Sequence, residues 1–474
     1  MMKEFVPRDS TVRPDSGGNW PRLLVGGALL LVLIAFFLPR RHDRAGEGTG
    51  ATNAPEEGST ASSFASERAR RFSRGLSPAL APTAGEIVTN KVNQFARNRR
   101  EVVRAIARKF KLEVPDELER FFEAVEAGRW DEIEGLAKAL RENLRSADLL
   151  KLWPPVHETW GAVQEARNWP AQKLLDYGNA ILDSLRPGMV YVGGTDSGRW
   201  IPTMLNETSE GEHHIVLTQN GLADGTYLDY LNFLYGDRLA TLSSDDSKRA
   251  FDEYLTDAQK RFRHDQEFPD EPKQVRPGED IKVIENKTQV SGQVAVMSIN
   301  EKLLEMLMAK NPDTAFGLQE SFPLKSTYAD AMPLGPLMEL RARDGQNAFT
   351  PELAAQSLDY WRAATQELLS DPTAAASEEA LLANSHNIVA AANLLAAHNY
   401  MAEAEQAYRL SSQLWPANPE PIGGLSELLF RAGRADEARQ LLDDFARKNP
   451  GEREAMERIR ATWSVVAAKG ASPQ

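Results

Sequence analysis

The pattern of apolar residues along the chain begins with one long uncharged run. Leu23 to Leu38 reads LLVGGALLLVLIAFFL, and Trp20 precedes it as an interfacial aromatic residue. A membrane-spanning helix needs roughly 17 to 25 predominantly apolar residues, so the run predicts a transmembrane anchor at 23–38. A cleaved signal peptide is the alternative, but a Pro-Arg-Arg sequence stands where a small-residue cleavage site would be.

Polar segments flank this run on both sides. Four basic residues in the N-terminal segment 1–22 balance three at positions 40–44, so positive charge does not decide the orientation of the span. Most of the segment 39–66 is rich in Gly, Ser, Thr and Ala and has no apolar period, which predicts a flexible linker. The pattern indicates a soluble body tethered to a membrane by a single span.

Helical periodicity dominates residues 67–185. Val88, Val92 and Phe95 begin an apolar stripe that continues to Phe110, while arginines occupy the opposite face. We expect a basic amphipathic helix that breaks or bends near Asn98. Contact with anionic lipid head groups is one interpretation of the basic face. We favour the other, a basic face packed against acidic parts of the protein.

The rest of this helical region is rich in aromatic residues. Gly128 separates two apolar helical stretches and predicts a helix hairpin. We expect Trp153, Trp160 and Trp169 to fill the seams between helices rather than to stack on sugars.

The period changes in residues 186–343, where short apolar strands alternate with helices. This alternation predicts a small Rossmann-like α/β domain with a parallel-type sheet. The expected strands are Met189–Val192, His214–Thr218, Val294–Met297, Ala315–Leu318 and Leu337–Leu340, and the expected helices are Arg199–Glu207, Thr226–Tyr235 and Glu301–Lys310.

Polar residues follow three of these strands, at the edge where ligands bind in such sheets. A Gly-rich turn after the first strand leads into a helix, so it directs free backbone N–H groups toward a ligand. The candidate ligand-binding residues are Gly193, Gly194, Thr195, Asp196, Ser197, Arg199, Asn220, Asp224 and Asn300. A helix N-cap or turn role for Asp196 is an equally weighted alternative.

No catalytic residues can be assigned from sequence motifs. The turn lacks the Walker and G-x-G-x-x-G patterns, and no nucleophile elbow is present. His213 and His214 form too small a set for a metal site, and no cofactor is predicted. The absence of Cys excludes disulfides, thiolate metal ligands and Cys nucleophiles. A net charge of -13 argues against a nucleic-acid partner.

A repeat with a period of 34 residues marks the C-terminal region, 344–474. Pro416 and Pro450 are 34 residues apart, and the residue pairs Leu395/Leu429, Asn399/Gly433, Ala404/Ala438 and Tyr408/Leu442 align with the same offset. This period is typical of tetratricopeptide repeats. Helical patterns at Pro351–Leu369 and Glu378–Ala397 extend the stack, which predicts an α-solenoid that binds a protein or peptide.

Several segments together resemble a known protein family. They are GMVYVGGTDSGRWIPT, LTQNGLADGTYLDYL, FLYGDR, AVMSIN, QESFPLKSTY and the repeat tail. They resemble the soluble extracytoplasmic part of bacterial multi-spanning membrane glycosyltransferases of the protein O-mannosyltransferase-like type. The resemblance covers about residues 170–450, and its strongest matches are Gly193, Gly194, Asp196, Asn220, Tyr227, Glu320 and Phe322. It implies a periplasmic body, but the polytopic catalytic domain of that family has no counterpart in a chain with one predicted span.

Two functions compete on these observations. We favour a membrane-anchored envelope adaptor without catalysis, whose repeats bind a protein partner and whose α/β module either binds a small anionic or glycosyl ligand or is purely structural. The alternative is a transferase or hydrolase acting on a sugar or phosphate ester, with Asp196 as a base or metal ligand.

Overall fold

The computed structural model describes residues 81–143, 147–194, 197–276, 278–284, 287–340 and 349–470. The predicted anchor at 23–38 and the segments 1–22 and 39–66 lie outside these residues. One described helix, α15 (Glu378–Ala397), is long and apolar enough to cross a membrane by length and composition. It is packed inside the protein, where it contacts strands and neighbouring helices.

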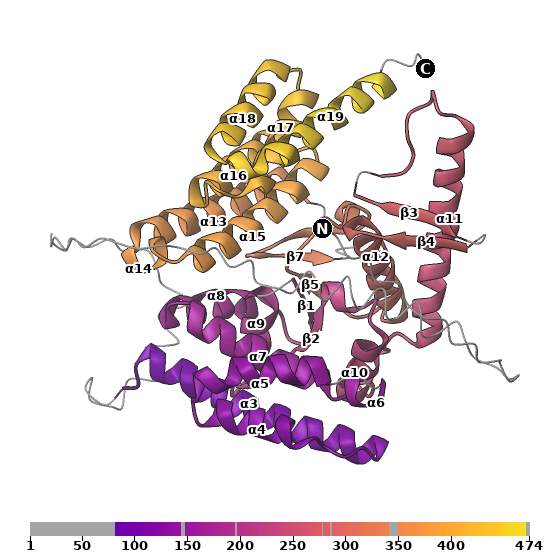
Figure 1. Cartoon of the computed structure of the whole chain (residues 1–474). Helices are drawn as coiled ribbons and strands as arrows, with labels where there is room; N and C mark the ends of the chain where they lie inside the picture. Colours follow the sequence, from indigo (N-terminus) through magenta and orange to yellow (C-terminus); the bar gives the residue numbers. More distant parts are fainter. Residues whose placement is uncertain are drawn as a thin grey trace, which may run out of the picture. The chain divides into compact units, whose positions relative to one another are not determined.

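Within the described residues, helices α3 to α8 precede the sheet (Figure 1). They are α3 (Ala84–Phe110), α4 (Asp116–Glu126), α5 (Trp130–Asn143), α6 (Ala147–Leu150), α7 (Trp153–Asn168) and α8 (Ala171–Ser184). The predicted break near Asn98 is wrong, because α3 is continuous over 27 residues. A capping box between Thr83 and Glu86 starts the helix, and its buried stripe runs from Val88 to Ala107 without interruption.

The arginines of α3 pack against acidic side chains, as we favoured. Arg100 Nε lies 2.5 Å from Glu119 Oε2, and Arg104 Nη2 lies 2.9 Å from the same oxygen. Arg99 is buried and pairs with Glu158 at 2.6 Å and also with Glu207. These ion pairs connect α3 to α4, to α7 and to the helix after the first strand.

A five-stranded mixed sheet follows, in the order β2-β1-β5-β7-β6. Its strands are β1 (Val190–Gly193), β2 (Ile215–Thr218), β5 (Phe316–Leu318), β6 (Met332–Leu334) and β7 (Leu337–Leu340). β1 pairs in parallel with β2 and β5, whereas β7 pairs antiparallel with β5 and β6. The predicted parallel pairing therefore holds only for three of the five strands. The helices α9 (Ser197–Glu207) and α10 (Gly225–Tyr235) follow β1 and β2 as predicted.

The predicted strand Val294–Met297 is wrong, because these residues open helix α12 (Gln293–Lys310). A short apolar run can belong to a strand or to a buried helix, and its periodicity alone does not distinguish them. The buried residues Ala295, Ile299 and Leu303 recur every four positions, which places the apolar run on one face of a helix.

The polar stretch between α10 and α12 is also structured, although the sequence pattern indicated no element there. It forms α11 (Ser244–Glu267) and a hairpin of β3 (Asp280–Ile284) and β4 (Lys287–Ser291). Half of the α11 side chains are exposed and few are buried, so its apolar stripe is thin. Arg261 and Tyr254 of α11 both bond to the buried Glu279, which ties the helix to the hairpin.

The C-terminal region is a stack of helices with its own core. It comprises α13 (Pro351–Ser370), α14 (Pro372–Ala375), α15, α16 (Met401–Leu414), α17 (Pro419–Arg431), α18 (Ala435–Lys448) and α19 (Arg453–Gly470). The turns after α15 and α17 have the same geometry: Asn399 has φ 65° and Gly433 has φ 78°. Asn is among the few non-glycine residues that adopt this left-handed conformation readily, which explains its place at a glycine position.

These matched turns yield a stability prediction. Asn399→Val should lower the free energy of unfolding by about 1–2 kcal/mol, because a β-branched side chain is strained at positive φ. Asn399→Gly should change it by less than about 0.5 kcal/mol, since the residue is on the surface. Urea denaturation of both variants provides the measurement. Equal stability of the two would contradict the assigned turn.

Candidate functional site

The Gly-rich turn after β1 is closely packed on its described side. Thr195 and Asp196 lie outside the described residues, so the turn is seen at Gly193, Gly194 and from Ser197 onward. The Gly194 N–H donates to Gln319 Oε1 at 2.9 Å. A Cβ atom at Gly194 would lie 2.4 Å from that oxygen, so glycine is needed for the close approach. This N–H group is therefore bound within the protein.

The next two candidate residues lie at the start of α9. Ser197 Oγ donates to Glu165 Oε2 of α7 at 2.8 Å. The buried Arg199 guanidinium lies 3.9 Å from the centre of the Trp200 ring and 5.6 Å from that of Tyr227. Cation–π attraction of this kind stabilises a guanidinium that has lost much of its hydration.

Asn220 and Asp224 lie in the connection between β2 and α10. Asp224 caps α10, accepting a hydrogen bond from the Thr226 N–H at 2.8 Å. Burial raises the pKa of this carboxyl above its usual value. Asn220 belongs to the short helix η3 (Gln219–Gly221) and is buried, and its Oδ1 accepts no hydrogen bond in the structure as described. A buried acceptor without a partner is uncommon and calls for a reason.

The structure corrects the placement of Asn300, which we predicted at the end of a strand. Asn300 lies within α12, fully buried. Its Oδ1 accepts from the Ala223 N–H at 3.0 Å, and its Nδ2 donates to the Val296 carbonyl at 2.8 Å. Both ends of the amide are thus engaged, and Asn300 fixes the loop before α10.

Sequence reasoning missed the residue that links this turn to the repeats. Gln319 follows β5, and its Nε2 donates to Asn387 Oδ1 of α15 at 2.7 Å and to the Tyr177 hydroxyl of α8 at 3.2 Å. Together with the bond from Gly194, one buried amide joins the β1 turn, α8 and the first repeat. A polar pair, Gln319-Glu320, directly after a buried strand was the available signal.

The repeats pack as their sequence pattern requires. In tetratricopeptide repeats the pattern is W-x2-L-G-x2-Y in the first helix, then A-x3-F and a closing Pro. Small side chains let the helices approach, and a Cβ at Gly424 would lie 2.4 Å from the Tyr408 ring. The matching residues are Ile388, Ala391, Ala392, Leu395, Ala404, Tyr408 and Pro416 in one unit, and Ile422, Leu425, Ser426, Leu429, Ala438, Leu442 and Pro450 in the next.

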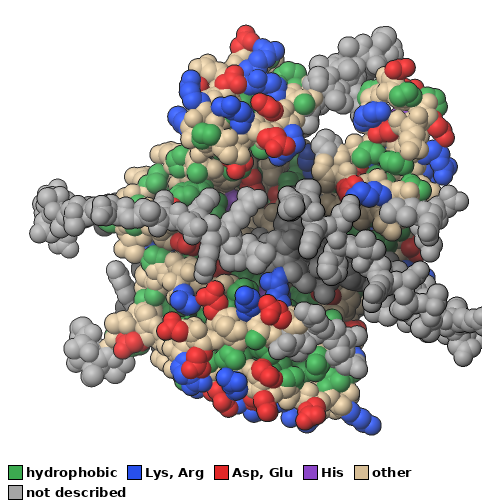
Figure 2. Space-filling view, viewed as in Figure 1, with side chains coloured by type: hydrophobic (Ala, Val, Ile, Leu, Met, Phe, Trp, Pro, Cys, Tyr) green, Lys and Arg blue, Asp and Glu red, His purple; other side chains and the backbone are tan. Residues whose placement is uncertain are grey.

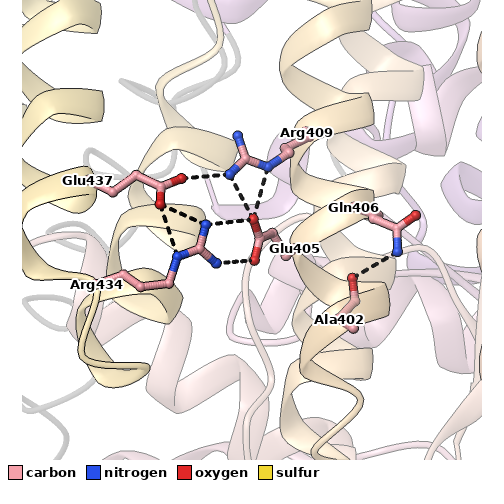
Figure 3. A network of polar contacts seen from close by, with 6 residues as sticks. All are labelled: Ala402, Glu405, Gln406, Arg409, Arg434 and Glu437. Atoms are coloured by element: carbon pink, nitrogen blue, oxygen red, sulfur yellow. Dashed lines mark hydrogen bonds and ion pairs between the residues drawn. The ribbon is translucent and has the colours of Figure 1, made fainter.

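Two polar contacts join the units. Inside, Asn418 Nδ2 at the start of α17 donates to Ser385 Oγ of α15 at 3.0 Å. Within the first unit, the Ser385 hydroxyl lies 2.8 Å from the Ser411 hydroxyl of α16. On the surface, two arginines and two glutamates form a closed ring of ion pairs between α16 and the start of α18 (Figure 3). Exposed ion pairs contribute roughly 0–1 kcal/mol each to stability. We therefore expect the ring to orient the two units relative to each other and to add little to the free energy of unfolding.

Comparison with known proteins agrees with this C-terminal geometry. Residues 394–461 match the family described as tetratricopeptide repeat. No curated protein and no solved structure matches the chain significantly. Over the part of the chain that the structure describes, no group of three or more His, Asp or Glu side chains could hold a metal ion. The fold and the match define a protein with a tetratricopeptide-like region, and such repeats generally mediate protein–protein contacts.

The Gln319 contacts yield a second prediction. Gln319→Met should lower the free energy of unfolding by about 2–4 kcal/mol, because it leaves the Gly194 N–H without its partner and breaks the bond to Asn387 in a buried environment. The exposed Gln172→Met on the surface of α8 is the matched control and should change it by less than about 0.5 kcal/mol. Thermal or urea unfolding measures both. A Gln319→Met variant as stable as the control would refute the role of this amide.

Proposed function

We propose that this protein is a membrane-anchored adaptor of the bacterial cell envelope, whose tetratricopeptide-like repeats bind a protein or peptide partner. The observation that carries the proposal is the pair of helix hairpins, α15–α16 and α17–α18, with matching left-handed turns. The family match covers residues 394–461, from the end of α15 into α19. Tetratricopeptide repeats generally mediate binding to other proteins.

We place the partner site on the second unit, α17–α18, rather than on the first, α15–α16. Helix α15 contacts β6, β7 and η4 (Tyr328–Asp330), so much of its surface is occupied by the protein's own sheet. Helix α17 keeps charged side chains in solvent: Glu420, Glu427 and Arg431 are each about half exposed, at 51%, 45% and 61%. Figure 2 shows charges of both signs interspersed over the repeat region. A polar, mixed-charge partner surface fits this face.

The anchor and the location rest on sequence. The apolar run at 23–38 followed by a flexible linker supports a single-pass membrane protein, and the resemblance to extracytoplasmic parts of envelope glycosyltransferases supports a periplasmic body. In this arrangement the linker lets the repeats reach partners beside the membrane.

Site-specific photo-crosslinking in cells tests the partner site. A benzophenone amino acid at Glu420 or Glu427 should capture a defined partner, because both side chains are exposed on α17. The same amino acid at Lys248, exposed on α11, is the control and should not capture it. Charge reversal of the neighbouring Arg431 should reduce the adduct at least several-fold. Equal capture from all three positions would contradict a partner site on α17.

A ligand site in the α/β module is the second candidate, favoured by one observation. Asn220 Oδ1 is a buried acceptor without a partner in the described structure, close in sequence to the buried Asp224. A donor from a sugar hydroxyl would satisfy that oxygen, and Arg199 would suit an anionic group. This supports a small glycosyl or anionic ligand at a Rossmann-like edge. The alternative function, a transferase or hydrolase, requires catalysis by Asp196 in addition to ligand binding at this edge.

Thermal-shift measurements test this ligand site with glucose 1-phosphate and UDP-glucose as probes. Binding to the folded state raises Tm by an amount that grows with probe concentration. We expect the rise to be lost in Asn220→Ala and kept in Gln172→Ala, whose side chain is on the surface of α8. If neither probe moves Tm, or if both variants respond alike, the ligand site is rejected.

A further inference from the structure

A buried carboxyl group lies at the contact between the sheet and the first repeat. Glu320 follows Gln319 at the end of β5 and is 6% exposed. The Tyr328 hydroxyl lies 2.9 and 2.8 Å from its two oxygens, and the Leu324 N–H donates at 3.3 Å. Asn393 of α15 donates from Nδ2 at 3.3 Å. The group is thus enclosed by hydrogen-bond donors from both sides of the contact.

No cation forms an ion pair with Glu320 in the described ranges. The carboxylate of Glu301 on α12, which has the same sign, also raises the pKa of Glu320. From the repeats, Tyr408 of α16 faces it, and Glu427 and Arg431 of α17 act on Tyr408. His398, at the end of α15, bonds to the Tyr328 carbonyl at 2.6 Å. Burial therefore dominates and raises the pKa of Glu320 to about 7.

A small cavity borders the carboxyl group. Its volume is about 10 Å³, close to the space of one water molecule. The sheet contributes Glu320 and the β6–β7 turn, and the helices contribute Trp361 of α13 and Asn387 of α15. The Trp361 Nε1 donor is buried and has no hydrogen-bond acceptor in the described structure. A buried donor of this kind in the lining of a cavity that also borders a carboxyl group makes the cavity a place for water to enter.

We propose that the contact between the sheet and the first repeat is a proton-sensitive junction, closed when Glu320 is protonated and loosened by entry of water when it ionises. A neutral carboxyl group can remain buried at this contact at low cost. An ionised one, which has no ion-pair partner among the described residues, is stabilised by hydration that the closed junction does not provide.

The change at Glu320 has a direct route to the second unit. Asn393 also accepts a hydrogen bond from the Tyr408 hydroxyl at 2.7 Å. The Tyr408 ring in turn packs against Gly424 of α17. Loosening at Glu320 therefore frees the side chain that positions α17, the helix on which we place the partner site. The junction itself does not depend on that placement.

The pH window follows from the two pKa values of the carboxyl group. Its value is about 7 in the closed junction and about 4.3 in a solvated chain. The closed form therefore binds the proton more tightly, and its stability falls as pH rises from about 4.3 to 7. Well below about pH 4.3 both forms are protonated, and well above about pH 7 both are ionised, so the change in stability levels off about one pH unit beyond either end of the range.

A distance measurement across the junction tests the proposal. The chain contains no cysteine, so Lys248→Cys on α11 and Asp436→Cys on α18 can be labelled without background in the full-length protein. Both positions are exposed. We expect a single narrow distance distribution at pH 5 and a second, broader one that grows with a midpoint near pH 7. Glu320→Gln should keep the narrow distribution up to pH 8.5.

Two further variants keep the test decisive. Tyr328→Phe removes a donor that favours the ionised carboxylate, so it should move the midpoint to higher pH, a shift that a merely structural role would not produce. Glu367→Gln changes an exposed acid on α13 and should leave the midpoint where it is. A transition that persists in Glu320→Gln, or a wild-type distribution unchanged between pH 5 and 8.5, would overturn the proposal.

Discussion

The buried amide of Gln319 is the interaction on which the arrangement of this protein depends. A single side chain accepts from the turn after β1 and donates to α8 and to the first repeat. Unpaired amide groups are costly in a dry environment, so the three elements can separate only together. The α/β unit and the repeats are therefore joined by a specific polar contact. Positions 194 and 198 require glycine, because a Cβ atom at either one would collide with the Gln319 side chain.

Most local elements followed from the sequence because their signals are local. The helices after β1 and β2 were predicted from their apolar patterns, and the 34-residue offset aligned Asn399 with Gly433, the two residues that have positive φ in the structure. The failures have physical causes as well. The short apolar run at Val294 is compatible with a buried strand and with a buried helix. In the structure it is a helix, and Asn300 of that helix bonds to the loop between β2 and α10. Misassigning that run also misplaced Asn300.

The candidate site was less predictable because its contacts are long-range. Gln319 meets partners that are 68 to 142 residues away in the chain, and no local pattern encodes such pairings. The sequence marked Gly193 and Gly194 as ligand-binding candidates, on the expectation that their backbone N–H groups face a ligand. What approaches Gly194 in the structure is a side chain of the protein itself. A Gly-rich strand–turn–helix thus indicates that another group approaches the backbone closely at this turn. That group can be a ligand or a side chain of the same protein.

The apolar composition of α15 is likewise a sequence pattern with more than one structural explanation. This helix is apolar enough to cross a membrane, yet it carries Asn387 and Asn393 on its buried surface. Its composition reflects burial from two directions: by the repeat core on one side and by β6, β7 and η4 on the other. A repeat helix at the free end of a stack would need a polar outer face. Here the sheet replaces that face, so the α/β unit serves as the cap of the solenoid, and removing it would expose the most apolar helix of the repeats.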